Sequence, residues 1–507
     1  MKNGRYIYLA ATIVSAPFIK ANAQENQPGP VKTPNIIFIM ADDMGYGDLG
    51  CYGQPFISTP NIDSLASTGV RFTQAYSGSP VSAPSRASLM TGQHTGHTTV
   101  RGNKEYWRGT DTLTYGVNKE YAVVGQHPYS ADRVILPEIL KDNGYTTGLF
   151  GKWAGGYENS ISTPDKRGID DFFGYICQFQ AHLYYPNFLN RYYPEQGDTA
   201  VVRVVMEDNI DYPMYGPEYR NRSQYSGDLI HQEAMKWIGK QSADKPFAAF
   251  LTYTLPHAEL YQPNDSLLQY YEQKFTDDFD WGGQEASRYN ATKNVHAQFA
   301  AMITRLDAYV GEIVDLLEET ALDENTIIIF TSDNGPHEEG GADPKFFGRD
   351  GKLRGLKRQC YEGGIRIPFI VNWKGTTAEG IESDRQIVFY DMMPTICDLL
   401  GVDLETAYDP TGTDGISFLP TLQGKEQPER DFLYWEFHET DQIAVRKDDW
   451  KLIVVMGEPR LYNLKEDLGE TTDIAAAHPD IVADMLRIIK EQHVDSPLFP
   501  ITLPQFP

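Results

Sequence analysis

Short runs of apolar residues recur along the chain, separated by longer amphipathic segments. The clearest run, residues 35–40 (NIIFIM), lacks polar alternation, as is typical of a strand buried on both faces of a parallel sheet. Residues 293–319 instead carry apolar side chains at helical spacing. The pattern predicts an α/β fold in which helices sandwich a mostly parallel central sheet. Similar runs predict further strands at 146–150, 248–254, 326–331 and 368–372.

The pattern changes after about residue 425. Short strands are predicted at 432–437, 442–446 and 451–455, joined by turns, and a helix follows near 479–492. We interpret this region as a small antiparallel sheet with a helix that packs on the main domain. The predicted organisation is an amino-terminal segment 1–23, a main domain 24–425 and a C-terminal α+β subdomain 426–507.

The amino terminus has the order of a secretory signal peptide. Lys2 and Arg5 precede an apolar stretch, and Ala21-Asn22-Ala23 then provides a small-residue cleavage site. The stretch is too short to span a bilayer as a helix, which takes about 20 residues. We therefore predict an exported protein, periplasmic or extracellular, with no stable membrane insertion. The alternative is a buried core segment.

The charge composition of the chain disfavours some classes of binding partner. The chain has 44 basic against 70 acidic side chains, a formal net charge of −26. Such a charge repels polyanions at long range, so a nucleic-acid or anionic-membrane partner is disfavoured. Four scattered cysteines are too few for a disulfide framework.

Carboxylates follow two of the predicted strands. Asp42 and Asp43 come directly after the first strand, and Asp333 and Asn334 follow the strand at 326–331. Hard divalent cations take carboxylate and amide oxygens as ligands. If the two strands are neighbours, these side chains form one cation site. The alternative is two separate turns capped by Asp and Asn.

A helix start is predicted near residue 82. Ser82 stands just before Pro84, which suits a first helical turn, and Arg86 follows. The amino end of such a helix offers unpaired N–H groups to an anion, and Arg86 adds a charged donor. An ordinary serine-capped helix start explains the same residues.

The segment from Ser82 to Gly92 (SAPSRASLMTG) resembles the signature of the type I, formylglycine-dependent sulfatases in their serine-type bacterial form, which belong to the alkaline phosphatase superfamily. Asp42-Asp43 and residues 333–335 are similar to the family's calcium-binding pairs. Residues 353–368 resemble its downstream lysine motif. The matches occur in the family's order and extend over most of the chain.

The resemblance implies a modified serine and a bound cation. A maturation enzyme would oxidise Ser82 to formylglycine, whose hydrate is the family's nucleophile. An unmodified serine is a weak nucleophile without an activating base or metal. The calcium ligands implied are Asp42, Asp43, Ser82, Asp333 and Asn334.

The resemblance also implies roles for charged residues outside the cation site. Arg86, Lys152 and Lys357 would neutralise charge on the sulfuryl oxygens. His257 and Lys357 correspond to the pair that faces the leaving-group oxygen, which makes His257 the candidate general acid. Exposed lysines and a structural histidine remain alternatives.

One departure from the family pattern bears on the substrate. Ala154 follows Gly151-Lys152-Trp153 where the family usually has a histidine that assists the second step. Some carbohydrate sulfatases that also lack it carry a motif like residues 180–186 (QAHLYYP), and they mostly act on sulfated galactose or N-acetylgalactosamine. On this basis His182 and Arg101 are candidates for sugar recognition, with core packing as the alternative for His182.

These observations lead to a hypothesis of a calcium-dependent sulfatase that removes an O-sulfate group from a carbohydrate. One rival is a phosphatase or phosphodiesterase of the same superfamily with Ser82 unmodified. Such an enzyme normally uses a two-metal site richer in histidine. Another rival, suggested by Ala154, is a catalytically silent glycan-binding protein.

Overall fold

The computed structural model describes residues 33–107, 123–210, 223–283, 289–349, 351–408 and 412–506. The predicted signal peptide, 1–23, lies outside these residues. Pro34–Pro507 form one compact unit, and the description below concerns this unit alone. The domain boundary between 425 and 426 stays a prediction.

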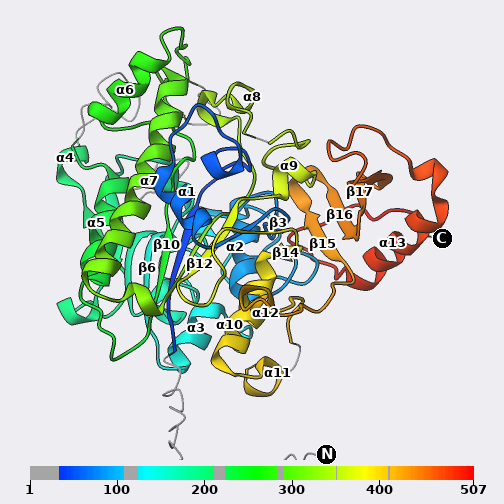
Figure 1. The fold of residues 1–507 in the computed structure, drawn as a ribbon, viewed down its shortest axis with the longest axis horizontal. Helices are drawn as coiled ribbons and strands as arrows, with labels where there is room; N and C mark the ends of the chain where they lie inside the picture. Colours follow the sequence, from blue (N-terminus) through cyan, green and yellow to red (C-terminus); the bar gives the residue numbers. More distant parts are fainter. Residues whose placement is uncertain are drawn as a thin grey trace, which may run out of the picture. The chain divides into compact units, whose positions relative to one another are not determined.

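A ten-stranded sheet forms the centre of the unit (Figure 1). Its inner strands β11, β1, β10, β6 and β7 run parallel to one another, and antiparallel pairs flank them on both sides. From edge to edge the strands are β13 (Ile381–Ser383), β2 (Val70–Phe72), β12 (Phe369–Trp373), β11 (Thr326–Ser332), β1 (Asn35–Ala41), β10 (Phe247–Thr252), β6 (Thr146–Lys152), β7 (Asp171–Tyr175), β8 (Phe188–Tyr192) and β9 (Val202–Val205).

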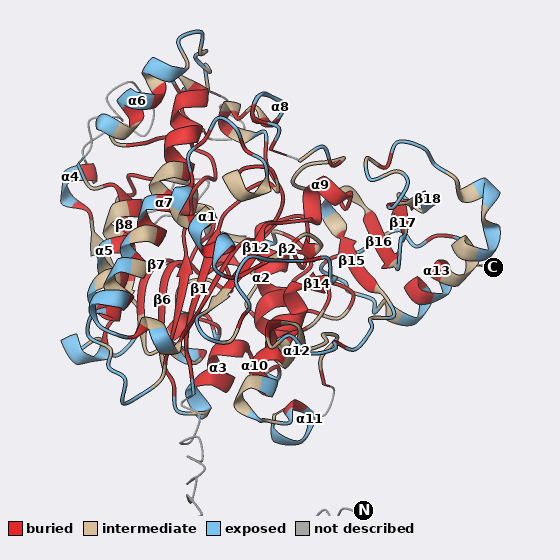
Figure 2. Ribbon diagram, in the orientation of Figure 1, coloured by how far each residue is buried: buried red, intermediate tan, exposed pale blue. Residues whose placement is uncertain are grey.

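Helices cover both faces of this sheet, because alternate side chains of each inner strand point to opposite sides. Ile37 and Ile39 belong to a core with α1 (Pro60–Ser67), α5 (Ser226–Ile238), α6 (Ser266–Lys274) and α7 (Val295–Glu319). Ile36 and Phe38 belong to a second core with α2 (Ser82–Thr91), α3 (Leu136–Asp142), α10 (Met392–Leu400) and α12 (Leu419–Leu422). The buried strands between the two helical layers are red in Figure 2. The predicted sandwich is confirmed.

The C-terminal region forms the predicted small antiparallel sheet. It consists of β15 (Leu433–Phe437), β16 (Gln442–Lys447), β17 (Trp450–Val455) and β18 (Glu458–Asn463), followed by α13 (Pro479–Gln492). One face of this sheet packs on α13 through Met485 and Ile489. The other face packs on the main part of the unit, where Trp435 and Phe437 meet Tyr76 and Ile365.

The remaining elements are short. Two-stranded pairings join β14 (Ile387–Val388) to β3 (Ala75–Tyr76) and β4 (Glu105–Trp107) to β5 (Val123–Gln126). The short helices are α4 (Glu207–Ile210), α8 (Pro344–Phe347), α9 (Glu362–Ile365) and α11 (Leu404–Ala407).

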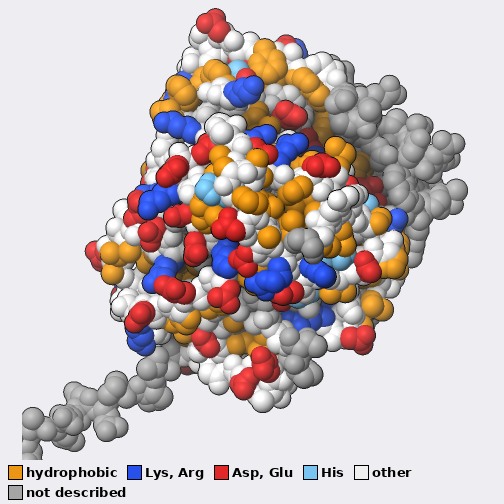
Figure 3. Space-filling view, turned by 90° about the vertical axis from the view of Figure 1, so that its right-hand side faces the viewer, with side chains coloured by type: hydrophobic (Ala, Val, Ile, Leu, Met, Phe, Trp, Pro, Cys, Tyr) orange, Lys and Arg blue, Asp and Glu red, His pale blue; other side chains and the backbone are white. Residues whose placement is uncertain are grey.

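One face of the molecule mixes both signs of charge (Figure 3). On the face shown in Figure 3, Lys and Arg side chains lie interspersed with Asp and Glu side chains. Within the described ranges, no helix combines the length and the apolar character needed to cross a membrane.

The sheet order brings the candidate residues together. Strands β11, β1, β10 and β6 are consecutive neighbours, and Ala41 of β1 lies opposite Ser332 of β11. Because these strands are parallel, the segments that follow them emerge at the same edge, where ligands gather in such sheets. Those segments carry Asp42, Asp333 and His257, and Lys152 is the last residue of β6.

Candidate active site

Two pairs of polar residues meet where β1 and β11 end. The backbone N–H of Asp43 donates to Asp333 Oδ1 at 3.0 Å, and Asn334 Nδ2 donates to Asp43 Oδ1 at 2.6 Å. Asp43 has a φ of 63°, a left-handed conformation that Asp tolerates better than most residues. Asp42, Asp43, Asp333 and Asn334 are all buried. The two strands are neighbours, which was the condition for a single cation site.

Ser82 joins this cluster from the first turn of α2. Its hydroxyl donates to Asp42 Oδ1 at 3.0 Å and lies 3.4 Å from Asn334 Oδ1. Helix α2 begins at Ser82, after an extended Val81, so Pro84 falls in the first turn as predicted. Only 3% of Ser82 is exposed. The side chain is thus held against the carboxylates and not on the outer surface.

Two buried cations neutralise part of the cluster. Lys152, at the end of β6, places Nζ 2.6 Å from Asp42 Oδ2. Arg86 donates two hydrogen bonds to Asp333 Oδ2, from Nε at 3.0 Å and from Nη2 at 2.8 Å. Its Nη1 donates to the Lys152 carbonyl at 2.9 Å. The Arg86 fork therefore fixes Asp333 and the end of β6 in relation to each other.

The donor set fits a hard divalent cation. Three carboxylates, one amide oxygen and one hydroxyl lie together in buried positions, and such oxygens are the preferred ligands of Ca²⁺ and Mg²⁺. Burial and the charge of Asp42 raise the pKa of Asp333, although Arg86 and Lys152 oppose that rise. A divalent cation held here would offset the repulsion among the carboxylates. The residues that would hold it are Asp42, Asp43, Ser82, Asp333 and Asn334.

Lys357 and His257 lie beside Asp43. Lys357 Nζ donates to Asp43 Oδ2 at 2.8 Å, to His257 Nε2 at 2.9 Å and to Glu339 Oε2 at 3.0 Å. The other ring nitrogen of His257, Nδ1, makes a short hydrogen bond to the Ala258 carbonyl. Because a carbonyl only accepts, we assign the ring proton to Nδ1 and the lone pair to Nε2. Burial and then Lys357 lower the pKa of His257 to about 4, so the ring is neutral at pH 7.

A cavity of about 190 Å³ opens onto these residues. His182, from the 3₁₀ turn Gln180–His182, lines it and stacks on His257 with ring centroids 4.3 Å apart. The lining residues are Val81, Ser82, Asn103, Glu105, Lys152, Gln178, Phe179, His182, His257, Tyr289, Glu339, Lys357 and Arg358. Ser82, Lys152, His257, Lys357 and His182 were all predicted from the sequence.

Arg101 does not line this cavity. Its guanidinium is buried, with Nε donating to the Thr98 carbonyl at 2.9 Å and Nη1 donating to the Val494 carbonyl at 2.5 Å. It also pairs with Glu436 at 3.3 Å. The sequence prediction of Arg101 as a sugar contact needs correction, because these bonds hold the C-terminal region. Asn103, two residues further on, is a lining residue.

The sequence reasoning missed Glu339, which contacts Lys357, and Tyr289, which contacts Glu339. Glu339, in the loop after β11, accepts from Lys357 and from the Tyr289 hydroxyl at 2.9 Å, and it pairs with Arg358. The one sequence feature that could have pointed to Glu339 as a site residue is its position six residues after Asp333. Tyr289 lies in a segment with no recognisable motif.

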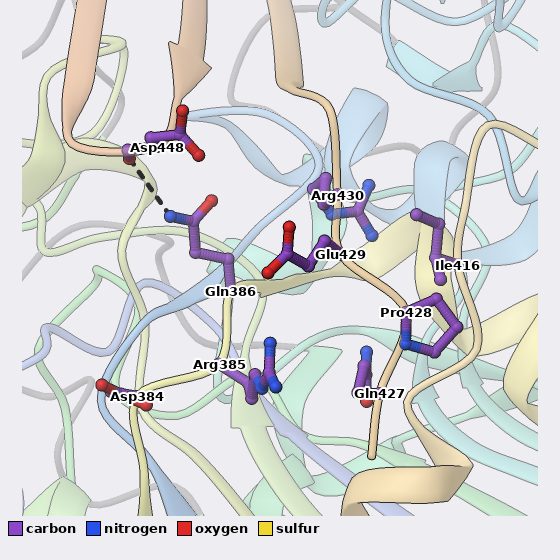
Figure 4. Close-up of a pocket in the computed structure, with 9 residues that line it drawn as sticks. All are labelled: Asp384, Arg385, Gln386, Ile416, Gln427, Pro428, Glu429, Arg430 and Asp448. Atoms are coloured by element: carbon purple, nitrogen blue, oxygen red, sulfur yellow. Dashed lines mark hydrogen bonds between the residues drawn. The ribbon is translucent and has the colours of Figure 1, made fainter.

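A second cavity, of about 370 Å³, lies between the β13–β14 connection and the turn after β16 (Figure 4). Gln386 Nε2 donates to the Asp448 carbonyl across it at 3.2 Å. Arg430 is held by the buried Asp391. Its lining contains no aromatic, histidine or cysteine side chain. It therefore offers neither a stacking surface nor a nucleophile.

His94, His97 and Asp414 form another group close enough to hold a metal. The backbone N–H of Gly96 donates to His94 Nδ1 at 3.1 Å, which places the ring proton on Nε2. That proton faces Gln492 Oε1 at 3.1 Å. A histidine nitrogen binds a metal through a free lone pair, and both nitrogens of His94 are already used in hydrogen bonds. We therefore interpret His94, His97 and Asp414 as a hydrogen-bond network.

The sheet, the carboxylate cluster at its strand ends and the cations around Ser82 define a hydrolase of the alkaline phosphatase superfamily. The chain belongs to the sulfatase family within it, whose members are sulfuric ester hydrolases, since the family described as Sulfatase matches residues 34–402. A second family, described as N-sulphoglucosamine sulphohydrolase, C-terminal, matches residues 355–494.

Characterised relatives cover most of the chain. The N-acetylgalactosamine-6-O-sulfatase of Bacteroides thetaiotaomicron is 28% identical over 93% of this chain and 94% of its own. The N-acetylgalactosamine-6-sulfatase of Rattus norvegicus is 31% identical over 78% of this chain and 67% of its own.

Among solved structures, Ps i-CgsB is similar with a TM-score of 0.71 and 26% identity, covering 93% of this chain and 95% of that one. The same protein has been solved in complex with k-i-k-neocarrahexaose. A phosphonate monoester hydrolase of Agrobacterium radiobacter shares the fold, with a TM-score of 0.59 and 22% identity over 91% of this chain and 96% of that one.

Proposed function

We propose that the protein hydrolyses an O-sulfate ester of a carbohydrate, with sulfated galactose or N-acetylgalactosamine as the substrate class. The observation that carries this proposal is the convergence of Ser82, Lys152, His257 and Lys357 on one cavity beside three buried carboxylates. The named activities of the two relatives, both N-acetylgalactosamine-6-sulfatases, support the choice of sugar.

The reaction depends on a modification and a cation that complete the site. A maturation enzyme would oxidise Ser82 to formylglycine, and the hydrated aldehyde supplies the nucleophile. Calcium on Asp42, Asp43, Ser82, Asp333 and Asn334 would polarise the sulfate ester. The remaining chemistry is done by the side chains around them.

Lys152 and Lys357 provide the fixed positive charge that the sulfuryl oxygens require. Both ammonium groups line the cavity and are nearly fully buried, so little water screens them. Arg86 contributes indirectly as well, because it holds Asp333 and the Lys152 carbonyl at fixed positions. Fixed cations of this kind stabilise the negative charge of the transition state.

His257 is the proposed general acid for the leaving sugar oxygen. In the free site its Nε2 accepts from Lys357, so it must gain a second proton before it can donate one. Asp43 Oδ2, 3.2 Å from Nε2, favours that proton, and the negative charge of a bound sulfate favours it further. Lys357 and His257 thus act as a pair at the leaving-group side.

His182 is the proposed sugar contact. It lines the cavity, and its face is fixed by stacking on His257. Within the described residues no hydrogen bond to its ring nitrogens is observed, which leaves them to a ligand. Ala154, at the position where a histidine is usual, is buried with its N–H bonded to the Ile176 carbonyl at 3.2 Å.

A phosphatase or phosphodiesterase of the same superfamily is the second candidate, and a phosphonate monoester hydrolase shares the fold. The oxygen donors at the ends of β1 and β11, with Ser82 of α2, favour the sulfatase, since together they would form one site for a hard cation. We also propose export to the periplasm or the medium, on the strength of the amino-terminal sequence.

The test is sulfate release from a panel of monosulfated monosaccharides, with matched phosphate esters, before and after chelation of calcium. We expect turnover of at least one sulfated galactose or N-acetylgalactosamine and of no phosphate ester. Ser82→Ala should lower turnover at least about 10³-fold. Ser88→Ala, a buried serine of the same helix that does not line the cavity, is the matched control. Turnover confined to phosphate esters would contradict the proposal.

A further inference from the structure

The residues that line the active-site cavity divide into a floor and a rim. The floor consists of Ser82, Lys152 and His257, each at most 3% exposed. The rim is more open and includes Asn103, Glu105, Glu339 and Arg358, which are only partly buried. A sulfate group belongs on the cationic floor, so the rest of the sugar must contact the rim.

Arg358 is the cation of the rim, and its charge is already balanced. Glu339 pairs with it on one side, and Glu439 Oε2 lies 3.9 Å from its Nε on the other. Its backbone is fixed as well, because its N–H donates to the Pro80 carbonyl at 2.8 Å and its carbonyl accepts from Thr440. A second anionic group of a substrate that approaches this guanidinium also approaches the carboxylates of Glu339 and Glu439.

The rest of the rim is rich in hydrogen-bond acceptors. Glu105 and Glu339 line it as carboxylates. The Gln178 amide donates through Nε2 to Asn103 Oδ1 at 2.7 Å, while its buried Oε1 has no hydrogen-bond partner. Acceptors suit the hydroxyl and amide donors of a neutral sugar, and carboxylates repel a neighbouring anion.

From this charge pattern we propose that the rim selects a sugar bearing a single sulfate and no other negative charge beside it. The inference rests on the proposed function and adds the charge state of the substrate. Glu439 contributes to this selection from the C-terminal region, because its Oε1 accepts the Asn103 N–H at 2.6 Å while its other oxygen faces Arg358. A sugar with a second sulfate or a carboxylate is a poor substrate for the same reason.

The experiment compares kcat/KM for the best monosulfated sugar from the panel with kcat/KM for the same sugar carrying a second sulfate. We expect kcat/KM for the disulfated sugar to be at least about tenfold lower, because its second sulfate would lie near the carboxylates of the rim. Glu105→Gln and Glu439→Gln each remove one negative charge and keep the side chain's shape. Each should raise the disulfated-to-monosulfated ratio at least about threefold.

Glu491→Gln, on the outer face of α13, removes an exposed charge away from the cavity and should leave the ratio unchanged. Equal or faster turnover of the disulfated sugar by the unmodified chain would overturn the inference, as would ratios in Glu105→Gln and Glu439→Gln that match Glu491→Gln. Either result leaves the sulfatase proposal intact. That proposal fails separately, if no sulfated sugar at all is hydrolysed.

Discussion

Replacement of Lys357 by Met tests the electrostatics of the leaving-group pair directly. The ammonium lies 2.9 Å from His257 Nε2 and is the largest charge effect that lowers the pKa of that ring. Even at the dielectric constant of water, a unit charge at that distance is worth about 1.4 kcal/mol, or about one pKa unit. The effect is larger in a buried site.

We therefore expect Lys357→Met to raise the pKa of His257 from about 4 to at least about 5. Loss of the cation also leaves Asp43 and Glu339 facing the ring, and both carboxylates act in the same direction. Nuclear magnetic resonance of labelled histidine side chains across pH measures the pKa, with the His257 signal identified from its loss in His257→Gln.

Lys357→Arg keeps the positive charge and is the matched control, in which the pKa should stay near that of the unmodified chain. Because Lys357→Met removes the ammonium that pairs with buried Asp43, its folding must be verified by circular dichroism before the titration. A folded Lys357→Met protein whose His257 pKa is unchanged would refute the reasoning.

Three further outcomes are expected. Burial lowers the pKa of His94 and of His257 to about 4 and that of His337 to about 3. In an unfolded chain the pKa of histidine is about 6.5. Between about pH 6.5 and pH 4 the unfolded state therefore binds more protons than the folded state. Stability should thus fall as pH drops from about 6.5 towards 4, and calorimetry that shows a constant or rising Tm would contradict this. Lys451→Met should cost about 3–5 kcal/mol in chemical denaturation, since it removes the buried ammonium that pairs with both Glu362 and Glu470. Lys374→Met, at an exposed ion pair, should change stability little. Chelation should lower Tm and added calcium should restore it. At a thousandfold excess of calcium over Kd, the gain in the free energy of unfolding should be about 4 kcal/mol, and an unchanged Tm would argue against a bound cation.

The fold was largely predictable because its inner strands are buried on both faces. The run at 35–40 became β1, and the helix predicted at 293–319 became α7, which begins two residues later because Asn294 adopts a left-handed conformation. Strands β8 and β9 were missed, since they are the last two strands on one side of the sheet and have weaker apolar character. β18 was missed for a similar reason, as Glu458–Asn463 contains charged residues and a proline.

The candidate site was predictable only in part. The carboxylates at the ends of β1 and β11 could be expected to meet, because parallel neighbours end at one edge. The contact of Lys357 with His257 spans 100 positions and rested on the family resemblance. Glu339 and Arg101 show where prediction from the sequence ends. Only the tertiary fold places Glu339 in the lining of the cavity and pairs Arg101 with Glu436.

The C-terminal sheet holds the loop that carries Lys357 and Arg358. Gln442 Oε1 accepts the Cys360 N–H at 2.8 Å, Thr440 donates to the Arg358 carbonyl at 2.9 Å, and Glu470 accepts the Glu362 N–H at 2.7 Å. An enzyme shortened to its first 425 residues would keep the proposed nucleophile and every proposed metal ligand. It would lose the hydrogen bonds that hold the loop with Lys357 and Arg358 in place. Chimeras that exchange the last 80 or so residues between relatives should accordingly alter reaction rate and not merely solubility.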